Sequence, residues 1–197
     1  MKLYGSDQSG HSYKVRLFLT LAQIEHEYIW VDLMLARKDR PADFMVAAKH
    51  GEVPVLIDGD LTICQSNAIL QHLAEKTGQY AGNHEVNEWL SWEANRIGFS
   101  LPNYRFARIW QKPPQEIMDY LLGRLLFDLK ILNKNLDGKN YLVADSLTIA
   151  DLSNSAYMFW LDDVGIDVNE YPNVKRWLNN IAALPHYQPP TILMAKP

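Results

Sequence analysis

The chain has 197 residues, of which 48% are hydrophobic and 21% are charged, and its formal net charge is −4. This length suffices to bury one large core or two modest ones. Because no basic stripe stands out, neither nucleic acid nor an anionic membrane is expected as a partner. The one cysteine, Cys64, excludes an internal disulfide framework and any CxxC redox or zinc motif, so no metal site is predicted.

The N-terminus reaches polar residues at once, so no secretory signal peptide is predicted. No apolar run approaches the ~20 residues that a helix needs to cross a bilayer. We therefore expect a cytoplasmic protein.

Residues 1–77 alternate between strand-like and helix-like runs, which predicts an α/β domain. The expected elements are a strand at 2–4, a helix around 15–22, a strand at 28–31, a short helix at 41–49, strands at 55–57 and 61–63, and a helix from Ser66. The dipeptide Asp58-Gly59 favours positive φ and predicts the hairpin between the last two strands. The order is βαβ, then αββα.

Residues 78–84 are turn-rich and polar, and they predict a linker. Residues 85–197 then read almost entirely as helix, with no internal repeat. Four groups of apolar residues fall at helical spacing, and each group predicts one buried helix face. These groups are Val86, Trp89, Leu90 and Ile97; Ile117, Leu121, Leu125, Leu129, Leu132 and Leu136; Leu152, Ala156, Phe159 and Trp160; and Val174, Trp177, Leu178 and Ile181.

The pair Val53-Pro54 lies just before a predicted strand. A bond that precedes proline can be cis at little cost, and such a bond usually lies in a tight turn. A cis bond here would turn the N–H and C=O of Val53 outward, where they could pair with an extended peptide as an added strand. The alternative is an ordinary proline at the start of a strand, which is common.

The pair Gln65-Ser66 lies where a helix is expected to begin. The hydroxyl of Ser66 and the free N–H groups of the first turn could hold a carboxylate, helped by the helix dipole. Gln65 could accept a hydrogen bond from an adjacent amine. The alternative is that Ser66 only caps the helix.

Thr148 and Asp151 are three residues apart, at the start of the predicted helix that contains Leu152. Each side chain can satisfy a free N–H group there, and Asp151 takes the place of the usual Glu or Gln of a capping box. We interpret this pair as structural.

Four segments in their expected order resemble the cytosolic glutathione transferase family, of the serine-type, theta-like or a related bacterial class. Residues 51–73 resemble its glutathione-binding half, and residues 9–16 resemble its first loop and helix. Residues 146–151 resemble its buried capping motif, and residues 171–177 resemble a late helix. The resemblance implies a thioredoxin-like α/β domain at 1–77, a linker at 78–84 and an all-helical domain at 85–197.

The resemblance also implies that a hydroxyl near the first helix stabilises the thiolate of glutathione. Ser9 matches the register of the serine in the theta-like and delta-like classes. Ser12 is the alternative, although it is closer to the predicted helix start and could be the N-cap instead. Tyr4 lies inside the first strand, too early to match the tyrosine of the tyrosine-type classes, and we interpret Cys64 as a packing residue.

The glutathione site implied by the resemblance consists of Val53, Pro54, Gln65, Ser66, His50 and Lys49. Glu52 departs from the family pattern, because it is acidic where the glycine carboxylate of glutathione is usually approached. Lys49 or His50 could compensate for this charge. The aromatic and basic stretch 99–110 would contribute to a pocket for the electrophile, for which the candidates are Tyr104 and Arg108.

The sequence therefore predicts a glutathione transferase that conjugates glutathione to a small hydrophobic electrophile and forms a homodimer. One alternative is a glutathione-dependent reductase, peroxidase or isomerase on the same fold. Another is a protein that binds glutathione or a partner without catalysis.

Overall fold

A computed structural model describes residues 1–143 and 145–196. Its contacts divide the chain into two compact units, which we call the first unit and the helical unit. The first unit contains residues 1–81 and also the chain from Leu184 onward, whereas the helical unit contains residues 82–183. The sequence had assigned the chain from Leu184 onward to the helical domain, because a segment of this length has no periodicity that reveals where it docks.

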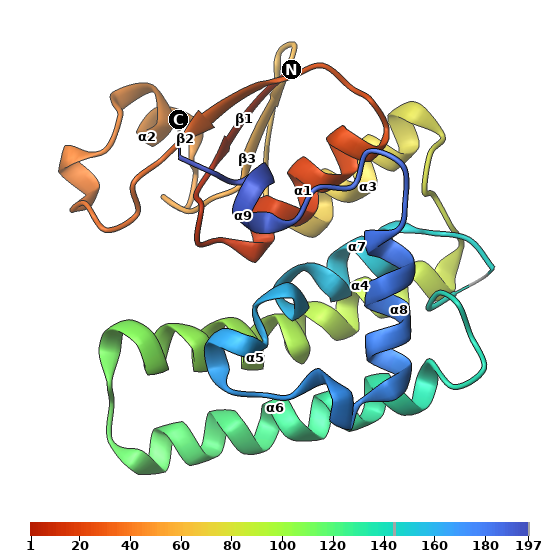
Figure 1. Ribbon diagram of the computed structural model, residues 1–197. Coiled ribbons are helices and arrows are strands. Elements are labelled where there is room, and N and C mark those ends of the chain that lie inside the picture. Colours follow the sequence, from red (N-terminus) through yellow and green to blue (C-terminus); the bar gives the residue numbers. More distant parts are fainter. Residues whose placement is uncertain (144, 197) are drawn as a thin grey trace. The chain divides into compact units, whose positions relative to one another are not determined.

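The first unit is a four-stranded mixed sheet with helices on its faces (Figure 1). Its elements are β1 (Lys2–Gly5), α1 (Gly10–Leu21), β2 (Glu27–Trp30), a 3₁₀ turn (Arg37–Asp39), α2 (Ala42–Ala47), β3 (Val55–Asp58), β4 (Leu61–Cys64), α3 (Ser66–Thr77) and α9 (Pro190–Leu193). The strand order is β2-β1-β3-β4, with β1 and β2 parallel and the other neighbours antiparallel. The predicted order of strands and helices through Thr77 is confirmed.

Both faces of this sheet are covered at β1. Successive side chains of a strand point to opposite faces, so two adjacent buried residues indicate burial on both faces. Leu3 and Tyr4 are adjacent in β1, and both are buried. Tyr4 packs in a cluster with Phe44 of α2 and Val55 of β3. Helices α1 and α3 lie side by side (Figure 1), and the ammonium of Lys14 donates to Asn67 Oδ1 across them at 2.8 Å.

The helical unit contains long helices followed by short turns. Its elements are α4 (His84–Asn95), α5 (Ile97–Phe106), a π turn (Ala107–Gln111), α6 (Gln115–Asn135), α7 (Ile149–Ser155), 3₁₀ turns at Ala156–Trp160, Asp162–Val164 and Val168–Glu170, and α8 (Pro172–Ala182). The predicted helical character of this region is confirmed.

Two predicted helices are interrupted. The apolar face from Val86 to Ile97 suggested one helix, but the chain breaks at Arg96, where φ is −119° and ψ is −98°. Gly98 permits this break, because a Cβ there would lie 2.8 Å from the carbonyl oxygen of Glu93. The predicted helix through Trp160 is α-helical only to Ser155 and continues as a 3₁₀ turn.

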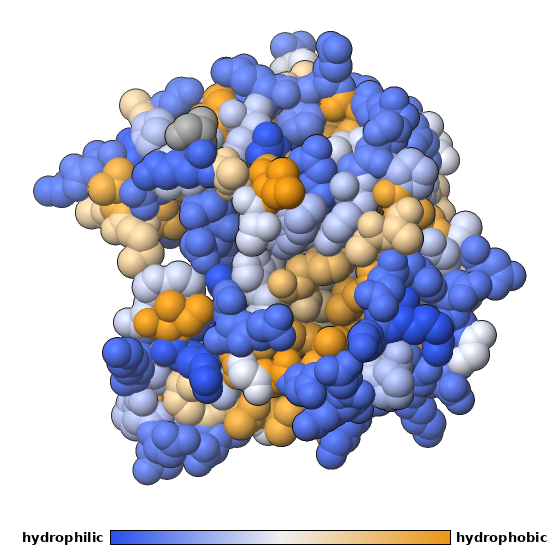
Figure 2. All heavy atoms as spheres, viewed as in Figure 1, coloured by the Kyte–Doolittle hydropathy of each residue, from blue (hydrophilic) through white to orange (hydrophobic). Residues whose placement is uncertain are grey.

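On the face seen in Figure 2, separate apolar patches lie among hydrophilic side chains. None of the helices that the structure describes has the length and apolar character that a membrane span requires. Over the same described residues, no group of three or more His, Cys, Asp or Glu side chains is placed to hold a metal ion.

Candidate functional site

Three chain segments meet at one edge of the sheet. The register pairs Tyr4 at the end of β1 with Val55 at the start of β3, and Val55 with Cys64 at the end of β4. Neighbouring strands lie about 4.8 Å apart, so these three positions span only about 10 Å. The loop into α1, the segment before β3 and the start of α3 therefore emerge at the same edge.

The start of α1 is capped by Ser9. Ser9 has extended backbone geometry, and its Oγ accepts a hydrogen bond from the N–H of Ser12 at 3.1 Å. A hydroxyl that accepts one hydrogen bond still has its O–H to donate. The suggestion that Ser12 is the N-cap is therefore wrong, because Ser12 lies inside α1, where its side chain is fully buried and its Oγ has no hydrogen-bond partner.

The start of α3 has no side-chain cap. Gln65 occupies the N-cap position with φ of 73°, and its side chain makes no capping hydrogen bond. Ser66 is the first helical residue rather than the cap, and its side chain is mostly buried. A positive φ is uncommon for a residue other than glycine and concentrates at ligand sites. The N-cap residue of α3 thus offers no side-chain acceptor to the first turn of the helix.

The segment before β3 carries the remaining predicted residues. The Val53–Pro54 peptide bond is cis, as the sequence suggested. Lys49 and His50 are exposed. Glu52 accepts a long hydrogen bond of 3.5 Å from Gln65 Nε2, so the acidic residue and the start of α3 are in contact.

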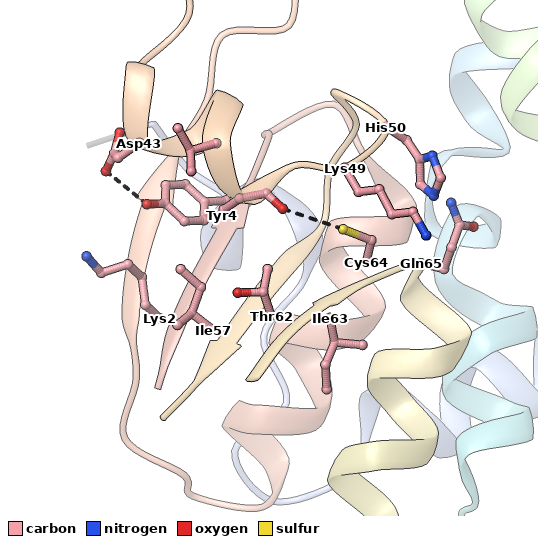
Figure 3. A pocket seen from close by; sticks show the side chains of 12 residues that line it. Lys2, Tyr4, Asp43, Lys49, His50, Ile57, Thr62, Ile63, Cys64 and Gln65 are labelled. Atoms are coloured by element: carbon pink, nitrogen blue, oxygen red, sulfur yellow. Dashed lines mark hydrogen bonds between the residues drawn. The ribbon is translucent and has the colours of Figure 1, made fainter. Parts of the chain in front are cut away.

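An open hollow of about 900 Å³ lies along the sheet beside this edge. Figure 3 shows Lys49, His50 and Gln65 at one end of the hollow, and the hydrogen-bonded pair Tyr4 and Asp43 at the other. Burial, the 2.9 Å hydrogen bond to Asp43 and the charge of that carboxylate raise the pKa of Tyr4 to about 12. Tyr4 therefore stays protonated at neutral pH.

Cys64 is half-buried within the same hollow (Figure 3). Its Sγ lies 3.8 Å from the carbonyl oxygen of Ala47 and donates a weak hydrogen bond to it. This contact fits its interpretation as a packing residue.

Two arginines that the sequence did not single out hold the turn at Gly51. Arg37 donates to the carbonyl of His50 at 2.9 Å, and Arg40 donates to the carbonyl of Gly51 at 3.0 Å. Arg40 also binds the carbonyl of Leu33 at 2.8 Å. Gly51 has φ of +68°, and a Cβ there would lie 2.9 Å from the guanidinium carbon of Arg37. The glycine at position 51 was a weak signal in the sequence, because glycine is preferred where φ is positive or where another group approaches the backbone closely.

The comparisons with known proteins agree with this arrangement. Residues 1–75 match the N-terminal domain model of glutathione S-transferase, and residues 102–185 match its C-terminal domain model. The chain belongs to the glutathione S-transferase family.

Individual relatives cover nearly the whole chain. The disulfide-bond oxidoreductase YfcG of Escherichia coli is 30% identical and aligns with 90% of this chain and 87% of its own. The crystal structure of a glutathione S-transferase from Pseudomonas fluorescens superposes with a TM-score of 0.87 at 28% identity, covering 96% and 98% of the two chains. The structure of glutathione S-transferase-I bound with lactoylglutathione has a TM-score of 0.83 at 27% identity, covering 98% and 99%.

The two candidates for the electrophile pocket of this glutathione S-transferase family member differ in exposure. Tyr104 is only 5% exposed, whereas Arg108 is exposed, with its guanidinium close to Gly165. Arg105, which the sequence did not single out, is buried and pairs with Asp163 at 2.7 Å. The sequence did not indicate that Arg105 is buried, because arginine is normally an exposed residue.

The predicted capping box is confirmed at the start of α7. Asp151 is fully buried, and its carboxylate accepts from the N–H of Thr148 at 2.9 Å and from the hydroxyl of Thr148 at 3.0 Å. It also accepts from the N–H of Leu142 at 2.8 Å and the indole of Trp177 at 2.9 Å. Burial raises the pKa of Asp151, and these four hydrogen bonds counteract part of that rise.

Proposed function

We propose that this chain is a glutathione transferase that binds glutathione at the sheet edge, stabilises its thiolate and transfers it to a small hydrophobic electrophile. The observation that carries this proposal is the meeting of two helix starts and the segment before β3 at one edge. A peptide that carries carboxylates and a thiol finds partners for each group there.

The γ-glutamyl end of glutathione fits the start of α3. Gln65 at its N-cap position makes no side-chain capping bond, and the helix dipole favours a carboxylate at its first turn. The hydroxyl of Ser66 adds a donor, and the carbonyl oxygen of Gln65 can accept from the γ-glutamyl amine. The backbone of Val53 pairs with the extended peptide in this proposal, and Lys49 and His50 offer positive or donating groups to its glycine carboxylate.

The thiol of glutathione then lies at the start of α1. A free thiol has a pKa near ~8.5, and lowering it by about two units requires about 2.7 kcal/mol of preferential thiolate stabilisation. The O–H of Ser9 and the positive end of α1 are suited to supply part of this energy. Ser9 retains 7% exposure whereas Ser12 has none, which favours Ser9 as the residue that reaches a bound thiol.

Disulfide reduction is a second candidate, because a relative at 30% identity is a disulfide-bond oxidoreductase. The same thiolate would attack a disulfide sulfur instead of an electrophilic carbon, forming a mixed disulfide and releasing the other sulfur as a thiol. A second glutathione would then resolve the mixed disulfide and leave as oxidised glutathione. Formation of oxidised glutathione from glutathione, with reduction of a model disulfide to its thiols, would distinguish this chemistry from conjugation.

We also propose that the chain forms a homodimer through the helical unit. Three large side chains on α6 share one stripe and are about half exposed, namely Ile117 (48%), Tyr120 (55%) and Phe127 (55%). Arg124 lies between them in sequence, with its guanidinium 5.3 Å from the ring of Phe99. A second copy of the chain would bury this stripe. Light scattering should report a dimer for the wild type and a monomer for Phe127→Asp.

The test of the proposed function is calorimetric titration of glutathione, with ultraviolet thiolate absorbance recorded on the same samples. The wild type and Ser12→Ala should bind glutathione and form thiolate, whereas Ser9→Ala should bind but lose most of the thiolate signal. Because Ser9→Ala also removes an N-cap worth about 1 kcal/mol, Ser9→Thr serves as the control that keeps both hydroxyl and cap. Absence of binding by the wild type would reject the enzyme, and an unchanged thiolate signal in Ser9→Ala would reject the role of Ser9.

A further inference from the structure

Residues 184–196, which we call the C-terminal strap, return to the first unit and bind α1 directly. The hydroxyl of Tyr13 donates to the carbonyl of Gln188 at 2.9 Å, and the guanidinium of Arg16 donates to the carbonyl of Leu193. Met194 is fully buried. The strap is therefore fixed along α1, the helix that Ser9 caps (Figure 1).

The end of the strap connects to the loop that carries Ser9. The ammonium of Lys196 lies 4.1 Å from the ring centre of Trp30, in the geometry of a cation–π contact. The indole N–H of the same Trp30 donates to Asp7 Oδ1 at 3.0 Å. Lys196 thus lies on the face of an indole whose edge binds a carboxylate two residues before Ser9. A cation on the ring face and an anion at the N–H polarise the indole in the same direction, so each contact strengthens the other.

Asp7 is a negative charge close to the place where a thiolate would form. Burial alone would raise the pKa of Asp7, but hydrogen bonds from Trp30, Gln8 and Ser6 outweigh burial and lower it. Asp7 is therefore ionised at neutral pH. A like charge nearby disfavours ionisation of a thiol, so Asp7 by itself opposes the chemistry proposed for Ser9.

The loop between Asp7 and Ser9 is short and ordered by its own hydrogen bonds. The N–H of Ser9 donates to the carbonyl of Ser6 at 3.1 Å, which closes a turn around Asp7. The Asp7 carboxylate is therefore carried by the same turn that positions Ser9. Other charged or titratable groups on the surrounding elements are His11, Lys14, Arg16 and Tyr28, with the guanidinium of Arg16 3.7 Å above the Tyr28 ring.

We propose that Lys196 is a positioning residue, which acts through Trp30 to hold Asp7 in place and to offset its charge beside the thiol site. This inference rests on the proposed function, because it concerns the thiolate that Ser9 stabilises. The strap supplies the positive charge from the far end of the sequence, so the electrostatics of the first loop depend on residues that follow the helical unit.

A double-mutant cycle between Lys196 and Asp7 tests the proposal. The variants are Lys196→Met, Asp7→Asn and the double variant, and the measurement is the thiolate absorbance of bound glutathione as a function of pH. Lys196→Met should lower the thiolate fraction at neutral pH about threefold, which corresponds to a rise of about half a unit in the pKa of the bound thiol. In the Asp7→Asn background, Lys196→Met should have a clearly smaller effect, because the part of its effect that acts through the position of Asp7 is gone and only the direct effect of the lysine charge remains.

The controls separate this electrostatic role from a general loss of structure. Lys130→Met removes an exposed lysine of α6 and should leave the titration unchanged. Trp30→Phe keeps the ring beneath Lys196 but removes the donor to Asp7, and it should shift the titration in the same direction as Lys196→Met. Thermal unfolding of Lys196→Met should stay close to the wild type, because Lys196 is exposed.

The outcomes distinguish the two proposals. If the wild type binds glutathione and forms thiolate but Lys196→Met titrates identically, the role of Lys196 is rejected and the proposed function stands. An equal effect of Lys196→Met in both Asp7 backgrounds would also reject it. Failure of the wild type to bind glutathione would reject both proposals.

Discussion

The starts of α3 and α7 show opposite treatments of the same structural problem. Every helix start leaves N–H groups without an intrahelical acceptor. At α7, the buried carboxylate of Asp151 and the side chain of Thr148 satisfy them within the protein. At α3, Gln65 occupies the cap position without a capping hydrogen bond, and its backbone is held at positive φ. A helix start that has a buried capping box serves stability, whereas one whose N-cap side chain makes no capping bond is suited to a ligand.

The comparison predicts that changes at α7 act on folding and changes at α3 act on binding. The largest effect is expected for Asp151→Asn, which places an amide N–H₂ where two donors converge. Because the site is fully buried, the unpaired donors should reduce the free energy of unfolding by about 2–4 kcal/mol. Urea unfolding measures this change, with the exposed Asp137→Asn as the control. A loss as small as that of the control would mean that the network contributes nothing to stability.

The next effect is expected at the turn beside the open helix start. Gly51→Ala forces a side chain into positive φ, which costs about 1–2 kcal/mol, and it also pushes against Arg37. Gly59→Ala is a matched control, because Gly59 has φ of +61° with no atom within 4 Å of the added Cβ. Both variants should lose stability in thermal unfolding, but only Gly51→Ala should also weaken glutathione binding. Equal binding by the two variants would contradict a role for this turn in the site.

Ser66→Ala should separate binding from folding at α3 itself. Ser66 is the first helical residue and not the N-cap, so we expect a change in unfolding free energy within about 0.5 kcal/mol. Loss of one hydrogen bond to a charged carboxylate should weaken glutathione binding about tenfold. Calorimetry on Ser66→Ala measures both the affinity for glutathione and the stability against unfolding. The exposed Ser91→Ala of α4 is the control. A large loss of stability with unchanged affinity would show that the start of α3, like that of α7, serves folding and not binding.

The smallest effect on stability is expected at Asp58, a carboxylate of the first unit whose ion pair is in contact with solvent. Asp58 accepts from Lys76 Nζ at 2.7 Å and contacts His72 Nε2 at 2.8 Å, and hydrogen bonds from these two residues lower its pKa. Because the folded-state pKa is depressed, the stabilisation is present above the unfolded value of about 3.9 and is lost as pH falls through the folded value. It should amount to less than about 1 kcal/mol, since solvent screens the pair.

Urea unfolding of the wild type and Asp58→Asn at neutral and acidic pH measures this contribution. The difference between the two proteins should be present at neutral pH and vanish once the pH has fallen below the depressed folded-state pKa of Asp58. A difference that grows on acidification would show that the sign is wrong.

The sequence predicted the parts of the fold that depend on local patterns. Hydrophobic periodicity gave the order of strands and helices, Asp58-Gly59 gave the hairpin, and Thr148 with Asp151 gave the capping box. Each of these signals lies within a few residues, where spacing determines which side chains can meet.

The features that it missed depend on contacts between distant segments or on backbone geometry without a residue preference. Arg37 and Arg40 hold a turn more than ten residues away, and nothing in their own surroundings indicates this. The positive φ of Gln65 has no sequence signal, because glutamine does not favour it. The sequence also could not decide whether Ser9 or Ser12 is the N-cap of α1. The two serines are less than one helical turn apart, and serine is a good cap at either position.

The return of the chain to the first unit has a consequence for the order in which the protein is made. Synthesis runs from the N-terminus, so α1 emerges long before Gln188 and Leu193, the residues whose carbonyls bind Tyr13 and Arg16. The whole helical unit is synthesised in between. The first unit therefore begins to fold first but obtains its last contacts only after the helical unit has left the ribosome.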